Sequence, residues 1–422
     1  MILSKQNTLS FCIRSLWVQG IVVAVLSAPV GMMRLVNMLW SGHYHKILIP
    51  LVTITAVFGF LLSNYGRKKV SLNALGFVLL YAIFSGTLIG VFNGGNPRNF
   101  VSHFFGALFM FSIYAFSYKQ PINLDWLNQF IRKSSFWILG AFLVVITLFW
   151  VVNIGFFGGS LYLGIGTGYL VLPLAYFLVH SKYRLALLTM ILILISGKRG
   201  PMLAAILVLV GYLPFFLRRK LISALVVSIF LSFIISLLYI QTDGLTDFDS
   251  LPVYLASPLT KVAAVNPYAE DYDADLAFSG RNQELFLASD HFFSNPVSPI
   301  MGLGFGWSYF FDALIPGSTT TDFNVHYVHL APANFFFTLG IPVAIFIIFS
   351  MWLIFFKAYR VIFLTEFSLI AKVILLFWIG SFANSLSGYS YPIDPTFWLS
   401  LAFLSKVANI KSKSYSHSIS EI

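Results

Sequence analysis

The sequence predicts an all-α protein that crosses a lipid bilayer about twelve times, and three observations carry this prediction. Of its 422 residues, 58% are hydrophobic and only 10% are charged, and the mean hydropathy is +0.85. That leaves too little polar surface for a water-soluble protein of this length. Apolar runs of roughly 20 residues, the length a helix needs to cross a bilayer, follow one another with short polar connectors. Barrel strands would read as short alternating segments instead, so helices are expected.

The expected spans form a single transmembrane domain, residues 1–422. The basic residues Lys5 and Arg14 before the first apolar run could indicate a signal peptide. That run is long and continues directly into further spans, so we expect an uncleaved first helix. In order, the spans cover residues 16–35, 47–64, 72–93, 99–117, 135–154, 160–180, 184–197, 201–217, 221–240, 333–356, 368–387 and 393–407.

The basic residues are distributed unequally between the two sides. With a cytoplasmic N-terminus, nineteen of the 26 lysines and arginines fall in cytoplasmic segments and seven fall outside. This is the bias that the positive-inside rule describes, and an even number of spans places both termini in the cytoplasm. The net charge of +11 therefore reports topology, and no nucleic-acid partner is expected.

One connector, residues 241–332, is much longer than the others and is expected to be a large external loop between the ninth and tenth spans. Eleven of the fifteen acidic residues lie in it. It is rich in aromatic residues and glycines, which is not the composition of a disordered segment, and long ordered loops are commonly functional. We expect short amphipathic helices in this loop and the chemistry of the protein beside it.

The short turn Ser-Gly-Lys-Arg-Gly-Pro, between the seventh and eighth spans, holds Lys198 and Arg199 near the external membrane surface. Gly200 and Pro201 begin the next helix, whose unpaired amides and positive dipole end would add to the guanidinium and form an anion site. The alternative is that both basic side chains simply extend from a helix end to the membrane surface.

Arg281 begins the stretch Arg-Asn-Gln-Glu-Leu-Phe-Leu-Ala-Ser-Asp-His-Phe-Phe, in which apolar residues recur at helical spacing. We interpret this stretch as a short amphipathic helix at the interface, with Arg281 at its start. The alternative role for Arg281 is a local salt bridge to Glu284. The glycines that follow, Gly302, Gly304 and Gly306, lack the preceding strand of a nucleotide-binding motif, so they predict a flexible or tightly turning loop against the membrane.

His326 and His329 stand three residues apart just before the tenth span. Imidazole suits proton abstraction near neutral pH, so either residue could act as a general base at the membrane surface. The alternatives are ordinary interfacial histidines or a zinc site. No spacing supplies the further ligands that zinc requires, so no metal and no cofactor are expected.

Taken in order, these motifs resemble the O-antigen polymerase and O-antigen ligase superfamily. The match covers roughly residues 190–345: a Ser-Gly-Lys-Arg-Gly turn, a Ser-Gly-Arg sequence in the large loop, an Asn-Pro sequence before alternating glycines, and a histidine before a span. The resemblance implies a metal-independent glycosyltransferase of the bacterial inner membrane with its active site facing the periplasm. Its partners would be an undecaprenyl-diphosphate-linked oligosaccharide, an acceptor glycan, the bilayer itself and a chain-length regulator.

The resemblance also implies roles for individual residues. Arg199 and Arg281 take the positions of the family's two arginines, and His329, eleven residues before Gly340, takes the position of its histidine. Leu330 stands where the family has asparagine, which leaves His326 as the alternative base. Lys198, His326 and Glu284 are the further residues expected to contact substrate.

Three functions remain open on this basis. The leading one is polymerisation of a surface polysaccharide. The first alternative is the ligase that transfers the finished chain to the lipid A core, which differs only in its acceptor. The second is a transporter or flippase of the lipid-linked sugar, although transporters usually carry paired repeats and charges deep in the bilayer.

Overall fold

The computed structural model describes residues 5–27, 43–65, 72–121, 123–157, 167–195, 199–217, 281–312, 322–325, 330–364, 368–386 and 394–410. The expected ninth span, residues 221–240, lies outside this part of the chain. So do Lys198, His326 and His329, and most of the predicted external loop.

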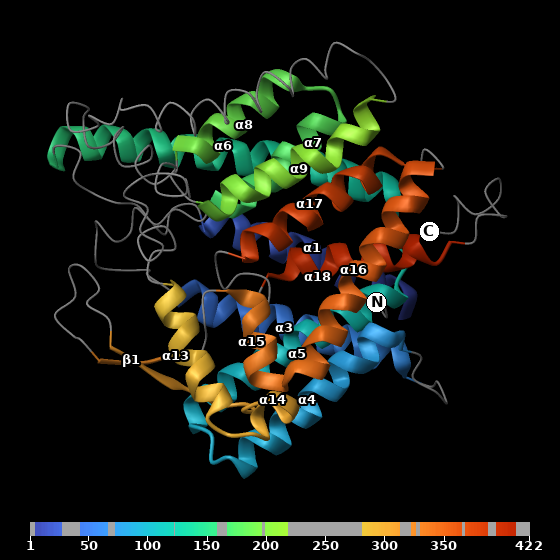
Figure 1. Ribbon diagram of the computed structural model, residues 1–422. Coiled ribbons are helices and arrows are strands. Elements are labelled where there is room, and N and C mark those ends of the chain that lie inside the picture. Colours follow the sequence, from blue (N-terminus) through green and yellow to red (C-terminus); the bar gives the residue numbers. More distant parts are fainter. Residues whose placement is uncertain are drawn as a thin grey trace.

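Within these residues the fold is helical, with fourteen α-helices, one 3₁₀ turn and one small hairpin (Figure 1). The first group of helices is α1 (Lys5–Ser27), α3 (His43–Asn64), α4 (Ala74–Phe92), α5 (Pro97–Lys119) and α6 (Leu124–Phe157). The turn η1 (Thr167–Leu170) precedes α7 (Val171–Val179), α8 (Tyr183–Ile195) and α9 (Arg199–Leu217). The remaining elements are α13 (Arg281–Phe293), α14 (Ser298–Met301), β1 (Tyr309–Asp312), β2 (Asp322–Val325), α15 (Ala331–Leu339), α16 (Ile341–Leu364), α17 (Leu369–Ser385) and α18 (Pro395–Ala408).

Four of the described helical stretches are long and apolar enough to cross a membrane: α4, α5, the Leu124–Leu148 part of α6, and α16. Shorter apolar helices occupy several of the other expected spans, among them Tyr183–Leu194, Gly200–Phe215 and Leu369–Ser385. The helical class is therefore confirmed. The number of spans stays a prediction.

Several helices begin where the sequence supplies a capping side chain. The Oδ1 atom of Asn96 accepts hydrogen bonds from the amides of Arg98 at 3.0 Å and Asn99 at 3.4 Å, and Pro97 is the first residue of α5. Asp394 precedes α18 in the same way and accepts from the amide of Thr396 at 2.8 Å. An acceptor side chain followed by proline satisfies free amides and presets the backbone angle, which explains both helix starts.

Four structural predictions need correction. The first helix, expected at 16–35, begins at Lys5, since the buried Cys12 and Ile13 extend its packed face toward the N-terminus. The expected tenth span, 333–356, is two helices, because Gly340 has φ +82° and separates α15 from α16. The helix expected at 135–154 begins at Leu124, since the buried Leu127 and Ile131 continue its apolar face. The large loop holds an antiparallel hairpin, with Tyr309 opposite Val325, in addition to its short helices.

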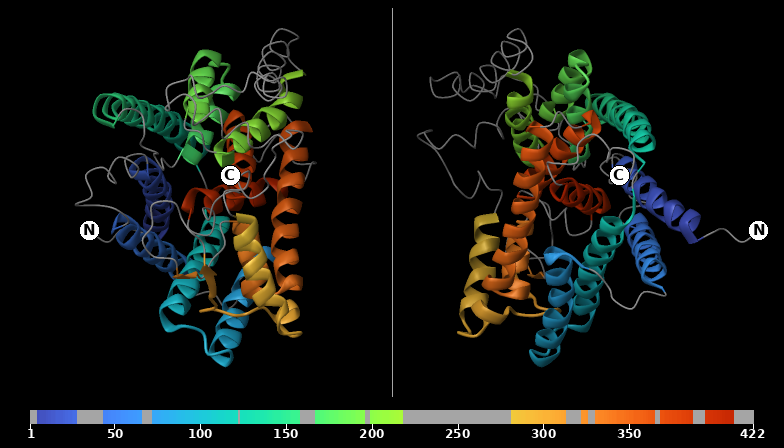
Figure 2. Two further views of the ribbon diagram at one scale, coloured as in Figure 1. Left: turned by 60° about the vertical axis from the view of Figure 1, so that its left-hand side comes forward. Right: turned by 90° about the vertical axis from the view of Figure 1, so that its right-hand side faces the viewer.

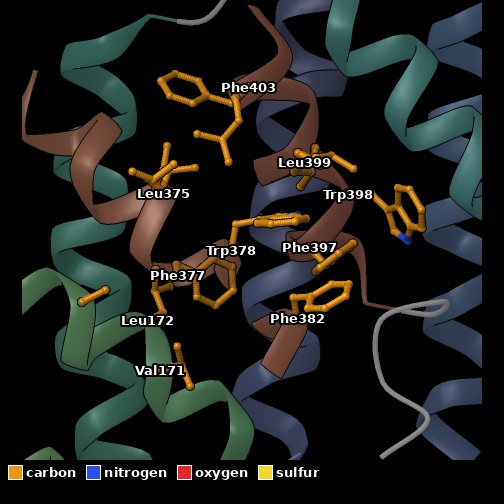
Figure 3. Packing of buried hydrophobic residues seen from close by; sticks show 14 of the residues in the cluster. Val171, Leu172, Leu375, Phe377, Trp378, Phe382, Phe397, Trp398, Leu399 and Phe403 are labelled. Atoms are coloured by element: carbon orange, nitrogen blue, oxygen red, sulfur yellow. The ribbon is translucent and has the colours of Figure 1, made fainter. Parts of the chain in front are cut away.

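The main hydrophobic core surrounds α17 and α18, which are buried along most of their length. Figure 3 shows their side chains against one another, with the rings of Trp378 and Phe397 at a centroid distance of 5.5 Å. Helices α5 and α16 pack on α18, and α7 and α9 pack on α17. These two helices are therefore enclosed by the rest of the bundle.

The contacts between helix ends agree with the predicted alternation of sides. Lys119 Nζ donates to Asn64 Oδ1 at 2.7 Å, and Lys5 Nζ donates to the carbonyl of Tyr65 at 2.8 Å. Lys406 Nζ likewise donates to the carbonyl of Gln120. Each contact joins two helix ends that the predicted topology assigns to the cytoplasm. At the opposite end of the α4–α5 hairpin lie the glycines of the predicted external loop.

Candidate functional site

The glycine segment, residues 302–307, is a tightly packed part of the predicted external side. Its backbone lies between the α4–α5 hairpin and the break between α15 and α16. On one side, the amide of Phe305 donates to the carbonyl of Gly86 at 2.7 Å. On the other, the amide of Gly304 donates to the carbonyl of Thr338 at 3.1 Å. The segment therefore joins two helix pairs that are distant in sequence.

Glycine is required in this segment because main chains approach one another closely. A Cβ atom on Gly304 would lie 2.2 Å from the amide nitrogen of Gly90, and one on Gly302 would lie 2.4 Å from the carbonyl oxygen of Thr338. Both residues also have positive φ, at +78° and +86°, a conformation that side chains disfavour. The sequence predicted a flexible or tightly turning loop, and the structure shows the second alternative: the segment is buried and turns tightly.

This packing gives a stability prediction. Gly304→Ala is expected to lower the free energy of unfolding by about 2 kcal/mol or more, because the new Cβ is both strained and overlapping. Gly106→Ala is the matched control: Gly106 is in helix α5, and a Cβ there meets nothing within 4 Å. The control should be neutral or slightly stabilising. Thermal unfolding of both purified variants in one detergent measures the difference; equal midpoints would contradict the close approach.

Phe305 is inserted into the α4–α5 hairpin at the centre of the segment. Its ring occupies the space above Gly86, where a Cβ would lie 2.5 Å from the ring. It makes edge contacts with Phe100 at 6.0 Å and Phe104 at 6.5 Å between centroids. Next to it is a cavity of about 50 Å³, apolar except for His103, Asn334 and Thr338.

A second, smaller core lies on the other side of the segment and is separate from the main core. It consists of Ala288, Phe292, Leu303, Trp307, Tyr309, Ala333 and Phe337. The indole Nε1 of Trp307 donates to Thr338 Oγ1 at 2.8 Å, and the ring of Phe337 lies 5.3 Å from that of Phe292. This core holds α13, β1 and α15 together, and Figure 2 shows them on the same side of the molecule as the α4–α5 hairpin.

Two of the predicted site residues, Arg281 and Glu284, lie on α13 of this second core. Arg281 is the first residue of α13, as expected. His329 lies outside the described residues but precedes Ala331, the first residue of α15, by two positions. Glu284, one turn after Arg281, is only 5% exposed. The structure thus brings together the helices that begin at or just after Arg281 and His329.

Arg199 is the first residue of α9, so this helix begins one residue before the start predicted at Gly200 and Pro201. Its side chain, like that of Arg281, is outside the description, and so is all of Lys198. Helix α9 packs on α17 and α7, in the group of helices at the top of Figure 1. The predicted anion-binding residues are therefore carried by two different helix groups.

The structure adds a residue that the sequence interpretation passed over. His103 lies on α5, inside an expected span, and its Nδ1 accepts a hydrogen bond from the amide of Gly306 at 3.0 Å. The two residues are 203 positions apart. A histidine inside an apolar span is a signal for function, and this rule could have identified it.

In the described part of the chain, no group of three or more histidine, cysteine, aspartate or glutamate side chains is placed to hold a metal ion. Comparison with protein-family models and with curated proteins gives no match for this chain. The class that the fold defines is therefore a helical protein whose described residues include four helices able to span a bilayer, as in a multi-pass membrane protein. Any more specific function has to be argued from its residues.

Proposed function

We propose that this protein is a surface-polysaccharide polymerase of the bacterial plasma membrane, a metal-independent glycosyltransferase that uses undecaprenyl-diphosphate-linked oligosaccharides. The observation that carries the proposal is that Arg199 and Arg281 are each the first residue of a helix. Both were assigned to diphosphate binding from the motifs they belong to. A helix start adds unpaired amides and a positive dipole end to the guanidinium, which favours a phosphate ligand.

The chemistry of the reaction fits these residue types. The acceptor hydroxyl attacks the anomeric carbon of the donor sugar, the bond from that carbon to the diphosphate oxygen breaks, and the hydroxyl proton passes to a base, proposed as His329. The leaving diphosphate gains negative charge as the bond breaks. Guanidinium groups bind phosphate oxygens through paired hydrogen bonds, and such fixed cations can replace a metal.

Purified protein in nanodiscs, supplied only with lipid-linked oligosaccharide units, tests the proposal. We expect a ladder of longer lipid-linked chains on a gel, with undecaprenyl diphosphate released. A product formed only when lipid A core is added would identify the ligase instead. Movement of the lipid across the bilayer without new glycosidic bonds would identify a transporter.

The topology gives a prediction that needs no substrate. Cys12 is the one cysteine in the sequence. In a Cys12→Ala background, a cysteine at Ser318 should react with an impermeant maleimide in intact cells, since residues 241–332 are proposed to be periplasmic. A cysteine at Lys119 should react only after the membrane is opened. The ammonium of Lys119 contacts Asn64 at the end of α5 that lies away from the glycine segment. The reverse labelling pattern would overturn both the orientation and the periplasmic site.

A further inference from the structure

We propose that His103 is a positioning residue for the transfer reaction, acting by holding the glycine segment through the amide of Gly306. This inference rests on the proposed function for its catalytic consequence, and on geometry alone for the contact. None of the sequence motifs includes His103, which lies in α5, 203 positions before the glycine it binds. Its role follows from what that hydrogen bond connects.

The contact determines the tautomer of the neutral imidazole. Nδ1 accepts from the Gly306 amide at 3.0 Å, so in the neutral ring the hydrogen is on Nε2. The ring also lies beside the two aromatic residues of the segment, with centroids 6.3 Å from Phe305 and 6.1 Å from Trp307. His103 therefore contacts the segment through one directional bond and through ring packing, and the two can be separated by substitution.

The glycine segment connects His103 to the helices next to the predicted catalytic residues. Trp307 follows Gly306 directly, and its indole donates to Thr338 Oγ1 in α15 at 2.8 Å. The same ring packs on Phe337 of α15 at 5.6 Å, within the core that includes Phe292 of α13. Displacing Gly306 would consequently move α15, which His329 precedes, relative to α13, which Arg281 begins. Small displacements of reacting groups cost large factors in rate.

Three substitutions separate the hydrogen bond from the packing. In asparagine, Oδ1 occupies nearly the place of the histidine Nδ1, so His103→Asn keeps the acceptor and removes the ring. His103→Phe keeps the ring and removes the acceptor, leaving the Gly306 amide unpaired. His103→Gln has its amide near the Nε2 position, so it is a second variant without the acceptor and remains informative if the phenylalanine protein does not fold.

The first measurement is independent of enzymatic activity. Nitroxide labels at Ser102→Cys in α5 and Asp290→Cys in α13, both exposed positions, report the distance between these helices in a Cys12→Ala background. Electron double resonance in nanodiscs should give a broadened or shifted distance distribution for His103→Phe and His103→Gln. The distribution for His103→Asn should match that of the parent. An unchanged distribution in the phenylalanine and glutamine proteins would overturn the inference.

The second measurement is the rate of polymerisation. His103→Phe and His103→Gln should lower kcat about tenfold to a hundredfold with little change in the KM for the lipid donor. His103→Asn should recover most of kcat. If His103→Asn lowers kcat as much as His103→Phe does, the hydrogen-bond acceptor at this position does not affect the rate and the inference fails. If the distances change as expected but the parent protein forms no polymer, the positioning contact stands and the proposed function fails.

Discussion

Replacing Arg281 with alanine is expected to lower the polymerisation rate at least a hundredfold, and Arg199→Ala is expected to do the same. The reason is the proposed leaving group, a diphosphate whose negative charge grows as the glycosidic bond to it breaks. Each arginine is the first residue of a helix, where its guanidinium would act together with free amides. The loss should fall mainly on kcat, since this charge is fully developed only in the transition state.

The control for these variants is Arg98→Ala. Arg98 is also in the first turn of a helix on the predicted external side, and it is exposed, but no motif includes it. Its replacement should leave the rate within a factor of about two, as for most surface changes. Arg281→Lys should recover only part of the rate, because an ammonium does not reproduce paired hydrogen bonds. Full activity in both the Arg199→Ala and the Arg281→Ala variants would rule out the proposal that these arginines bind the diphosphate.

The parts of the fold that could be predicted from sequence are those set by local pattern. Apolar runs located the helices, and the Asn96-Pro97 pair gives a clear helix start. The starts of α9 and α13 were predicted from local signals too, Pro201 for α9 and the apolar spacing after Arg281 for α13. Arg281 could therefore be placed at a helix start, and Arg199 next to one, without any tertiary information; α9 begins one residue earlier than predicted, at Arg199 itself.

The parts that could not be predicted depend on contacts between distant segments. Gly340, followed by Pro342, is a local helix-stop signal that the sequence interpretation passed over. What the sequence could not show is its partner: a Cβ on Gly340 would lie 2.2 Å from the carbonyl oxygen of Ile300. Likewise, only the folded chain brings His103 to Gly306. The alternating glycines predicted a turn, but not that Phe305 enters the α4–α5 hairpin. In each case the partner, not the residue itself, determines the role.

His329→Ala is expected to remove most glycosyl transfer, again by a factor of a hundred or more, while binding of the lipid donor stays nearly unchanged. A general base acts in the transition state, so its loss lowers kcat and not donor affinity. His329 stands two residues before α15, whose Ala333 and Phe337 belong to the second core. Donor binding is measured by isothermal titration, and transfer by gel analysis of chain length.

His326→Ala is the matched comparison, because His326 directly follows β2 and stands three residues before His329 in the sequence. Its effect should be milder, through the position of the hairpin and not through proton transfer. A dead His326 variant with an active His329 variant would mean that the motif was aligned three residues too late. Full turnover in both variants would mean that neither histidine is the base. The proton of the acceptor hydroxyl would then go to a carboxylate such as Glu284, which is buried and lies one turn after Arg281 on α13. Otherwise no dedicated base is needed, because the diphosphate departs well before the acceptor attacks.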